Sequence, residues 1–298
     1  MEATMNKILS NKKAIVFFIL PELLIFLFVV IYSVGCSFYY SLHSWNGITD
    51  KVFVGVQNYI SLFVNNTDGF LKAMMNPLIL AVLSVAIQLP LALFLAIVLA
   101  RGIKGSNFFR TAFFIPVLFS SVVMGQLWSM IYNPNYGLLN AILENLGIIK
   151  TGIAWLGNKN TALICTFVAM IWKYIGYYML LLYSAVKRIP AELFEAAEID
   201  GATKFKAAWH VIIPLSMPSI KTTVVMIVIG ALKAFDTIYV LTNGGPDHAT
   251  EVTSTLMYTT IFKKNLYGYG SSMAVFIVIE CLLFTVLLNL WKPKQYTY

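Results

Sequence analysis

Six long apolar runs dominate this sequence and restrict what it can fold into. A transmembrane helix needs about 20 consecutive, mostly apolar residues, and each run is about that long or longer. The runs cover residues 14–34, 77–100, 111–131, 161–183, 222–241 and 272–290. Because so many runs of this length can be buried together only in a lipid bilayer, we expect an all-α integral membrane protein with six transmembrane helices. We expect a single transmembrane domain over residues 1–298.

The composition of the chain agrees with a bilayer as its surroundings. Hydrophobic residues make up 59% of the sequence and charged residues only 11%, whereas soluble proteins have about 25% charged residues. This balance excludes a soluble enzyme, a disordered chain and a secreted disulfide scaffold. The three cysteines lie in or beside apolar runs, so we predict neither a disulfide framework nor a metal site.

The net charge of +8 is interpreted as a topology signal and not as nucleic-acid binding. If the N-terminus is inside the cell, most Lys and Arg residues outside the runs fall on the cytoplasmic side, as they do in membrane proteins generally. We therefore predict that the N- and C-termini are both cytoplasmic. We predict contact with membrane lipid and none with nucleic acid. The loops on the opposite side are longer, which suits the docking of an external partner.

The cytoplasmic loop over residues 187–218 is the most informative segment. Its pattern predicts a short helix, a break at Asp200 and Gly201, and a second helix that Asp200 caps. Pro214 and Pro218 are predicted to end the second helix and lead into the fifth span. Two interpretations stay open on spacing alone: an amphipathic surface helix that packs on the bundle, or a docking site for a partner protein.

Several motifs in this sequence resemble those of one membrane protein family. Glu195, Ala196, Ala197, Gly201 and Pro214 resemble the EAA loop of binding-protein-dependent ABC importer permeases, and the string EAAEIDGA is typical of the sugar-permease branch. Three further stretches resemble the same branch: RTAFFIPVLFSSVVMGQLWSMIYNPNYGLLN (110–140), FDTIYVLTNGGP (235–246) and YGYGSSMAV (267–275). Within the carbohydrate uptake branch, the chain is similar to the maltose-type and glycerol-phosphate-type first permease.

The resemblance implies a type I ABC importer permease fold in a prokaryotic cytoplasmic membrane. It implies a core permease domain over about 72–291, a first span with an external loop over 14–71, and the coupling loop 187–218. The implied partners are a second permease subunit in a heterodimer, two cytoplasmic ATPase subunits and an extracytoplasmic solute-binding protein. Residues implied to couple to the ATPase are Glu195, Ala196, Ala197, Asp200 and Gly201.

The sequence contains no G-x-x-x-x-G-K-[ST] phosphate-binding loop. We therefore expect a transporter subunit that is not an enzyme and has no catalytic residues. We also expect that the chain itself binds no cofactor. ATP and Mg are expected on the separate ATPase subunits.

Charged and aromatic residues within the fourth and fifth runs are candidates for the substrate pathway. A charge at the centre of a membrane helix costs about 2.5–3.5 kcal/mol, so such residues should face the bundle interior. Lys233 and Asp236 are three residues apart and are predicted to share a helix face, and Lys173, Tyr174 and Tyr177 are predicted to share another. With the positions that the maltose-type resemblance adds, the candidate pathway residues are Lys173, Tyr174, Tyr177, Gly230, Ala231, Lys233, Ala234 and Asp236.

Other interpretations of these residues remain open. The charges can form a structural Lys173–Asp236 or Lys233–Asp236 ion pair that touches no ligand. Aromatic rings beside polar groups favour a neutral oligosaccharide, but two lysines also suit glycerol 3-phosphate or an acidic sugar. An ion-coupled secondary transporter shares the apolar composition, although no inverted repeat is visible in the sequence.

Overall fold

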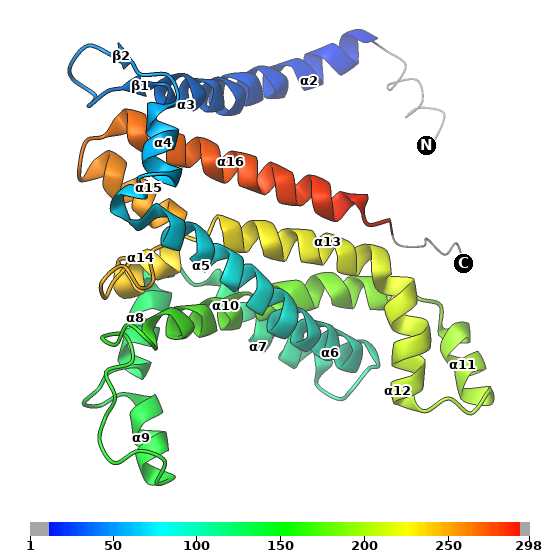
Figure 1. The fold of residues 1–298 in the computed structure, drawn as a ribbon. Helices are drawn as coiled ribbons and strands as arrows, with labels where there is room; N and C mark the ends of the chain where they lie inside the picture. Colours follow the sequence, from blue (N-terminus) through cyan, green and yellow to red (C-terminus); the bar gives the residue numbers. More distant parts are fainter. Residues whose placement is uncertain (1–11, 293–298) are drawn as a thin grey trace. The chain divides into compact units, whose positions relative to one another are not determined.

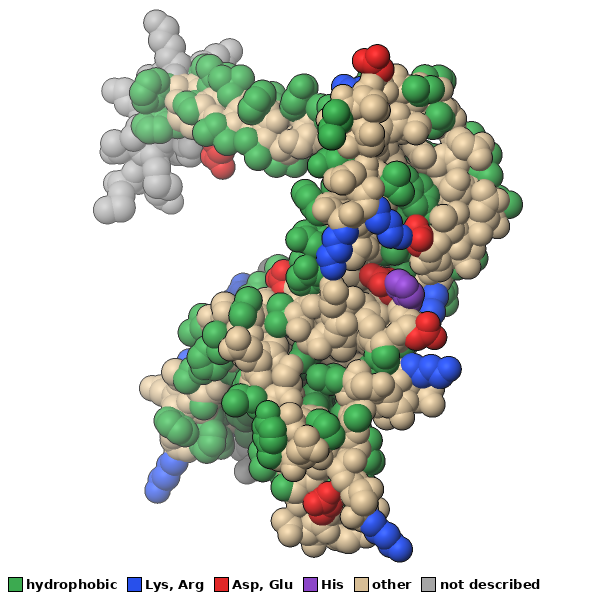
Figure 2. Space-filling model, turned by 90° about the vertical axis from the view of Figure 1, so that its left-hand side faces the viewer, with side chains coloured by type: hydrophobic (Ala, Val, Ile, Leu, Met, Phe, Trp, Pro, Cys, Tyr) green, Lys and Arg blue, Asp and Glu red, His purple; other side chains and the backbone are tan. Residues whose placement is uncertain are grey.

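The computed structural model describes residues 12–292 and is almost entirely helical (Figure 1). These residues form two compact units. The first contains the chain up to Asn65 together with Met257–Phe276, and the second contains Asn66–Leu256 together with the described residues from Ile277 onwards. On the face that Figure 2 shows, hydrophobic side chains are spread over the surface and charged side chains are fewer. Many large hydrophobic side chains are exposed in the structure, among them Phe94 and Phe108, as expected of helices that face lipid.

The first unit combines one long helical run with a small hairpin. In the hairpin, His43 lies opposite Phe53 and Ser44 lies opposite Val52 in an antiparallel pair. The Trp45 ring packs against Tyr267, with ring centroids 5.5 Å apart. The elements that lie wholly in this unit are α2 (Lys12–Phe26), η1 (Leu27–Tyr32), α3 (Ser33–Ser41), β1 (His43–Ser44), β2 (Val52–Phe53) and α4 (Gln57–Phe63).

The second unit holds most of the helical bundle. Its elements begin with η2 (Thr67–Gly69), α5 (Phe70–Leu83), η3 (Ser84–Gln88), α6 (Leu89–Ala100), α7 (Ser106–Leu118), α8 (Ser121–Ile131) and α9 (Leu138–Asn145). They continue with α10 (Ala162–Val186), α11 (Ala191–Ile199), α12 (Lys204–Ala207), η4 (Ala208–Ile212), α13 (Ile213–Leu232) and α14 (Asp236–Thr242). The helices α15 (Thr253–Phe262) and α16 (Tyr267–Leu290) each have residues in both units.

Helix α10 is the central element of the second unit. It runs beside α6 and α7 and also contacts α13 and α14 (Figure 1). The approach to α7 is close, because a Cβ atom at Gly176 would overlap the backbone oxygen of Phe113. Phe167 on α10 belongs to a buried apolar cluster with Leu80 on α5 and Leu232 on α13. The bundle core therefore forms where α10 meets its neighbours.

The predicted number of membrane spans agrees with the structure when one bent pair is counted as a span. In the described part of the chain, five helical segments are long and apolar enough to cross a membrane, and α7 and α8 together supply a sixth. The prediction of one uninterrupted helix over 111–131 is wrong, because α7 and α8 meet at an angle of 100°. The backbone of Phe119 is extended, and the Ser120 hydroxyl accepts a hydrogen bond from the Val123 amide to begin α8.

The predicted boundaries around the fifth span also need correction. Pro214 and Pro218 do not end a helix, because α13 continues directly from the π-helical turn η4 and contains both residues. A π-helical turn already shifts the backbone hydrogen-bond pattern, so the missing N–H of Pro214, directly after this turn, is tolerated there. Asp200 is not the residue before the second helix, because α12 begins at Lys204; the Thr203 hydroxyl accepts from the Lys206 amide at 3.3 Å near its start.

Candidate functional site

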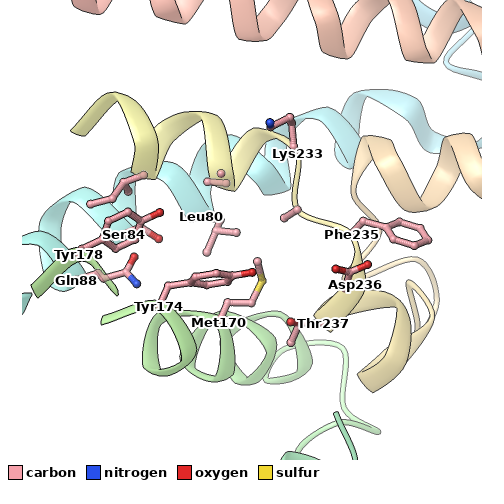
Figure 3. A pocket seen from close by; sticks show the side chains of 14 residues that line it. Leu80, Ser84, Gln88, Met170, Tyr174, Tyr178, Lys233, Phe235, Asp236 and Thr237 are labelled. Carbon is pink, nitrogen blue, oxygen red and sulfur yellow. The ribbon is translucent and has the colours of Figure 1, made fainter. Parts of the chain in front are cut away.

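A cavity of about 310 Å³ lies within the second unit, between α5, η3, α10, α13 and α14 (Figure 3). Both aromatic and polar side chains reach it. Its lining residues are Leu80, Ser84, Gln88, Met170, Tyr174, Tyr178, Ile227, Gly230, Ala231, Lys233, Ala234, Phe235, Asp236 and Thr237. A cavity of this size and lining is typical of a site for a small polar ligand.

A break in the fifth span forms one wall of the cavity. Helix α13 ends at Leu232, the chain is non-helical over residues 233–235, and α14 begins at Asp236. The prediction that Lys233 and Asp236 share a helix face is therefore wrong. Irregular backbone at membrane depth is tolerated where it is buried in protein or lines a cavity, and here it lines the cavity.

A hydrogen bond from a distant part of the sequence supports this break. The Ser254 hydroxyl, in α15, donates to the backbone oxygen of Ala234. That oxygen lies in the non-helical stretch, so the bond supplies a partner that a continuous helix would have provided. The break is thus part of the packed structure and is not a frayed helix end.

Two charged candidates are joined through a hydroxyl group. The ammonium of Lys173, which is 4% exposed, donates to the Ser121 Oγ atom at 3.2 Å. Ser121 in turn donates to Asp236 Oδ2 at 3.3 Å. In the described residues neither Lys173 nor Lys233 forms a direct ion pair with Asp236. The alternative of a direct ion pair is therefore wrong, and Ser121 links α8, α10 and α14.

Most of the predicted pathway residues lie together. Of the eight, six line the cavity: Tyr174, Gly230, Ala231, Lys233, Ala234 and Asp236. Lys173 does not line the cavity, but its ammonium donates to Ser121 and lies over the ring of Tyr174, 5.5 Å from the ring centroid. Tyr177 is also absent from the lining, and its ring packs edge-on against Tyr178 with the ring centroids 5.3 Å apart. Whether any of them contacts a substrate stays a prediction.

Sequence reasoning missed polar residues at this site. Ser84 and Gln88 lie in the π-helical segment η3, are almost fully buried, and line the cavity. The Gln88 side chain donates to the backbone oxygen of Ile171 at 3.0 Å, which holds it between η3 and α10. Their signal was visible, because they are polar residues inside the otherwise apolar run 77–100.

The predicted coupling loop forms a separate feature of the second unit. Glu195, Ala196, Asp200 and Gly201 are exposed, and Ala197 is half-buried. Gly201 has a φ of +75°, a conformation that favours glycine, and it lies in the turn between α11 and α12. The loop is anchored on its other side, where Leu193 and Phe194 pack against a buried cluster of Val186, Ile189 and Ile212.

These features define a polytopic helical membrane protein with a cavity at a broken span and an exposed loop between two spans. Residues 88–295 match the family of binding-protein-dependent transport system inner membrane components. The chain belongs to this family, which comprises permease subunits of ABC importers. It is therefore a multi-pass membrane permease subunit and not an enzyme, and ATP hydrolysis resides in a different subunit.

Curated relatives agree with this assignment over nearly the whole chain. A probable ABC transporter permease, YurN of Bacillus subtilis, is 37% identical over 96% of each chain. The diacetylchitobiose uptake permease NgcF of Streptomyces coelicolor is 34% identical over 90% of this chain and 79% of its own length. The trehalose/maltose permease MalF of Thermococcus litoralis is 33% identical over 90% of each. The resemblance to the carbohydrate branch is confirmed.

A solved structure confirms the fold. A chain of a bacterial ABC transporter involved in the import of the acidic polysaccharide alginate superimposes with a TM-score of 0.81 at 21% identity. The alignment covers 96% of this chain and 97% of that one. The ABC importer permease fold is thus established for this chain.

Proposed function

We propose that this chain forms half of the pathway through which an ATP-driven importer carries a neutral oligosaccharide. The observation that carries the proposal is the cavity at the break in the fifth span. Its lining combines the rings of Tyr174 and Tyr178 with hydrogen-bonding groups of Ser84, Gln88 and Thr237. Rings and such polar groups together offer a saccharide both stacking surfaces and donors or acceptors.

The charge of the cavity favours a neutral substrate over an anionic one. Lys233 and Asp236 are the charged lining residues, but the Lys233 ammonium points away from the cavity, so the Asp236 carboxylate is left to oppose an anion (Figure 3). The buried ammonium of Lys173 is already hydrogen-bonded to Ser121. Glycerol 3-phosphate or an acidic sugar would require an uncompensated cation in the lining. Membership in an ABC importer family also accounts for transport without an ion-coupled mechanism.

The proposed assembly contains a second permease subunit, two cytoplasmic ATPase subunits that carry ATP and Mg, and an extracytoplasmic solute-binding protein. We place both termini of this chain, which lie outside the described residues, in the cytoplasm of a prokaryotic cell, and its bundle in the cytoplasmic membrane. The coupling loop meets an ATPase subunit through Glu195, Ala196, Ala197, Asp200 and Gly201. The exposure of most of this set supports that role.

The test is sugar uptake by the complete importer in proteoliposomes. The sugar is first identified from the thermal shift it causes in the solute-binding protein. In the Tyr174→Ala variant we expect uptake to fall about tenfold, because the loss of one ring contact and hydrogen bond is worth on the order of 1.4 kcal/mol. ATPase activity should persist, because Tyr174 lies in the membrane bundle, away from the coupling loop.

A matched control removes an equivalent ring elsewhere. Tyr136 is 72% exposed and does not line the cavity, so Tyr136→Ala should leave uptake unchanged. Equal uptake by the wild type and by Tyr174→Ala would show that the cavity is not on the substrate path. Failure of the assembled complex to take up any sugar would contradict the proposed function as a whole.

A further inference from the structure

A second cavity, of about 750 Å³, lies beneath the coupling loop. It is bounded by the end of α6, the end of α10, the helix α11 and the turn η4. This cavity is separate from the one at the broken span, because the two share no lining residue. The proposed transport function assigns it no role.

The rim of this cavity is basic. Arg101 directly follows the last residue of α6, Lys187 caps the end of α10, and Arg188 follows it. Among the described lining residues Glu192 is the single carboxylate, so cations exceed anions there. Because Arg101 and Lys187 stand at the ends of two membrane-crossing helices, they lie at the level where lipid headgroups begin.

The floor of the cavity is apolar. Ala100, Pro190 and Phe194 line it and are half-buried, so each keeps apolar surface that a ligand can contact. A free phosphate or an acidic peptide would use the cationic rim but would leave this floor uncovered. An anionic phospholipid uses both, since its phosphate meets the cations and its acyl chain meets the apolar floor.

The ATPase contact proposed above uses a different side of the loop. Glu195, Ala196, Asp200 and Gly201 are exposed, and none of them lines the cavity. The loop thus presents one surface to solvent and covers the cavity with the other.

We propose that this cavity binds the headgroup and adjoining acyl carbons of an anionic phospholipid, with Arg101, Lys187 and Arg188 around the phosphate. The lipid would then sit directly beneath the coupling loop and support the position of α11. This inference goes beyond the transport function, and lipid binding is measured without sugar or nucleotide.

The test is native mass spectrometry of the full chain, purified together with the other subunits of its complex. Phosphatidylglycerol is titrated against phosphatidylcholine with identical acyl chains. We expect the wild type to prefer phosphatidylglycerol by about tenfold, and the double variant Arg101→Gln/Arg188→Gln to lose most of that preference. The variant Arg101→Lys/Arg188→Lys keeps the charge and should retain the preference, which separates loss of charge from loss of folding.

The matched control Lys104→Gln/Lys206→Gln removes the same charge from nearby exposed residues that do not line the cavity. It should bind phosphatidylglycerol like the wild type. The inference is overturned if the wild type shows no preference or if both Gln variants lose it equally. It is also overturned if inorganic phosphate alone binds the cavity as tightly as the lipid does, or if the lipid is absent whenever an ATPase subunit co-purifies. Lipid binding without sugar uptake would contradict the transport function alone.

Discussion

The hydroxyl group of Ser121 holds two charged side chains in a shared hydrogen-bonded arrangement. It accepts from the Lys173 ammonium and donates to the Asp236 carboxylate, so one small residue satisfies a buried cation and an anion from two other helices. Burial of an unpaired charge is costly, and a hydrogen bond to a charged group is stronger than one between neutral groups. At the residue scale, Ser121 therefore contributes to stability at the edge of the cavity.

We predict that Ser121→Ala lowers the free energy of unfolding by about 1–3 kcal/mol, because it leaves the Lys173 ammonium without this acceptor. The measurement is the thermal unfolding midpoint of the purified complex in detergent. Ser184→Ala is the control, since that exposed hydroxyl only bonds back to Leu180 in its own helix. Equal midpoints for the two variants would show that the Ser121 link does not stabilise the bundle.

At the scale of elements, the close contact of α7 and α10 fixes the centre of the bundle. Small residues let helices approach closely in membranes, where van der Waals packing drives association. Gly176 serves this purpose, since the backbone of Phe113 occupies the space that a side chain would need. Gly230 is different, because the nearest atom to an added Cβ there is the Tyr178 hydroxyl at 3.5 Å, an ordinary contact.

The two glycines therefore form a matched pair for an experiment. Gly176→Ala should destabilise the bundle by about 1–3 kcal/mol or more through overpacking, whereas Gly230→Ala should be nearly neutral for stability. The measurement is the monodisperse fraction of the detergent-extracted protein after brief heating. Similar losses for both variants would mean that the close packing of Gly176 against Phe113 does not stabilise the bundle.

At the scale of the whole molecule, the proposed mechanism depends on which side of the membrane holds the coupling loop. We predict that Glu195→Cys, in a background without Cys36, Cys165 and Cys281, reacts with a membrane-impermeant maleimide only after the cells are permeabilised. Tyr136→Cys, in the loop after α8, should react in intact cells. The opposite pattern would place the loop outside and would contradict coupling to a cytoplasmic ATPase.

The sequence predicted the spans and most of the cavity because both depend on local patterns. Apolar runs mark membrane helices, and intramembrane charges and aromatics mark the interior surface. The breaks could not be predicted in this way, because Phe119, Ala234 and Phe235 are apolar and do not interrupt the hydropathy pattern. The non-helical stretch at Ala234 is supported by Ser254, a contact between distant parts of the chain that no local pattern reveals.

The interrupted fifth span has a consequence for how firmly a passing solute is held. The end of a helix carries partial negative charge and the start of one carries partial positive charge. Lys233 follows the end of α13 and Asp236 opens α14, so each side chain offsets the dipole beside it. A sugar at this point would meet groups that are already electrically balanced. We therefore expect the sugar to bind there weakly and to dissociate quickly, as a transport pathway requires.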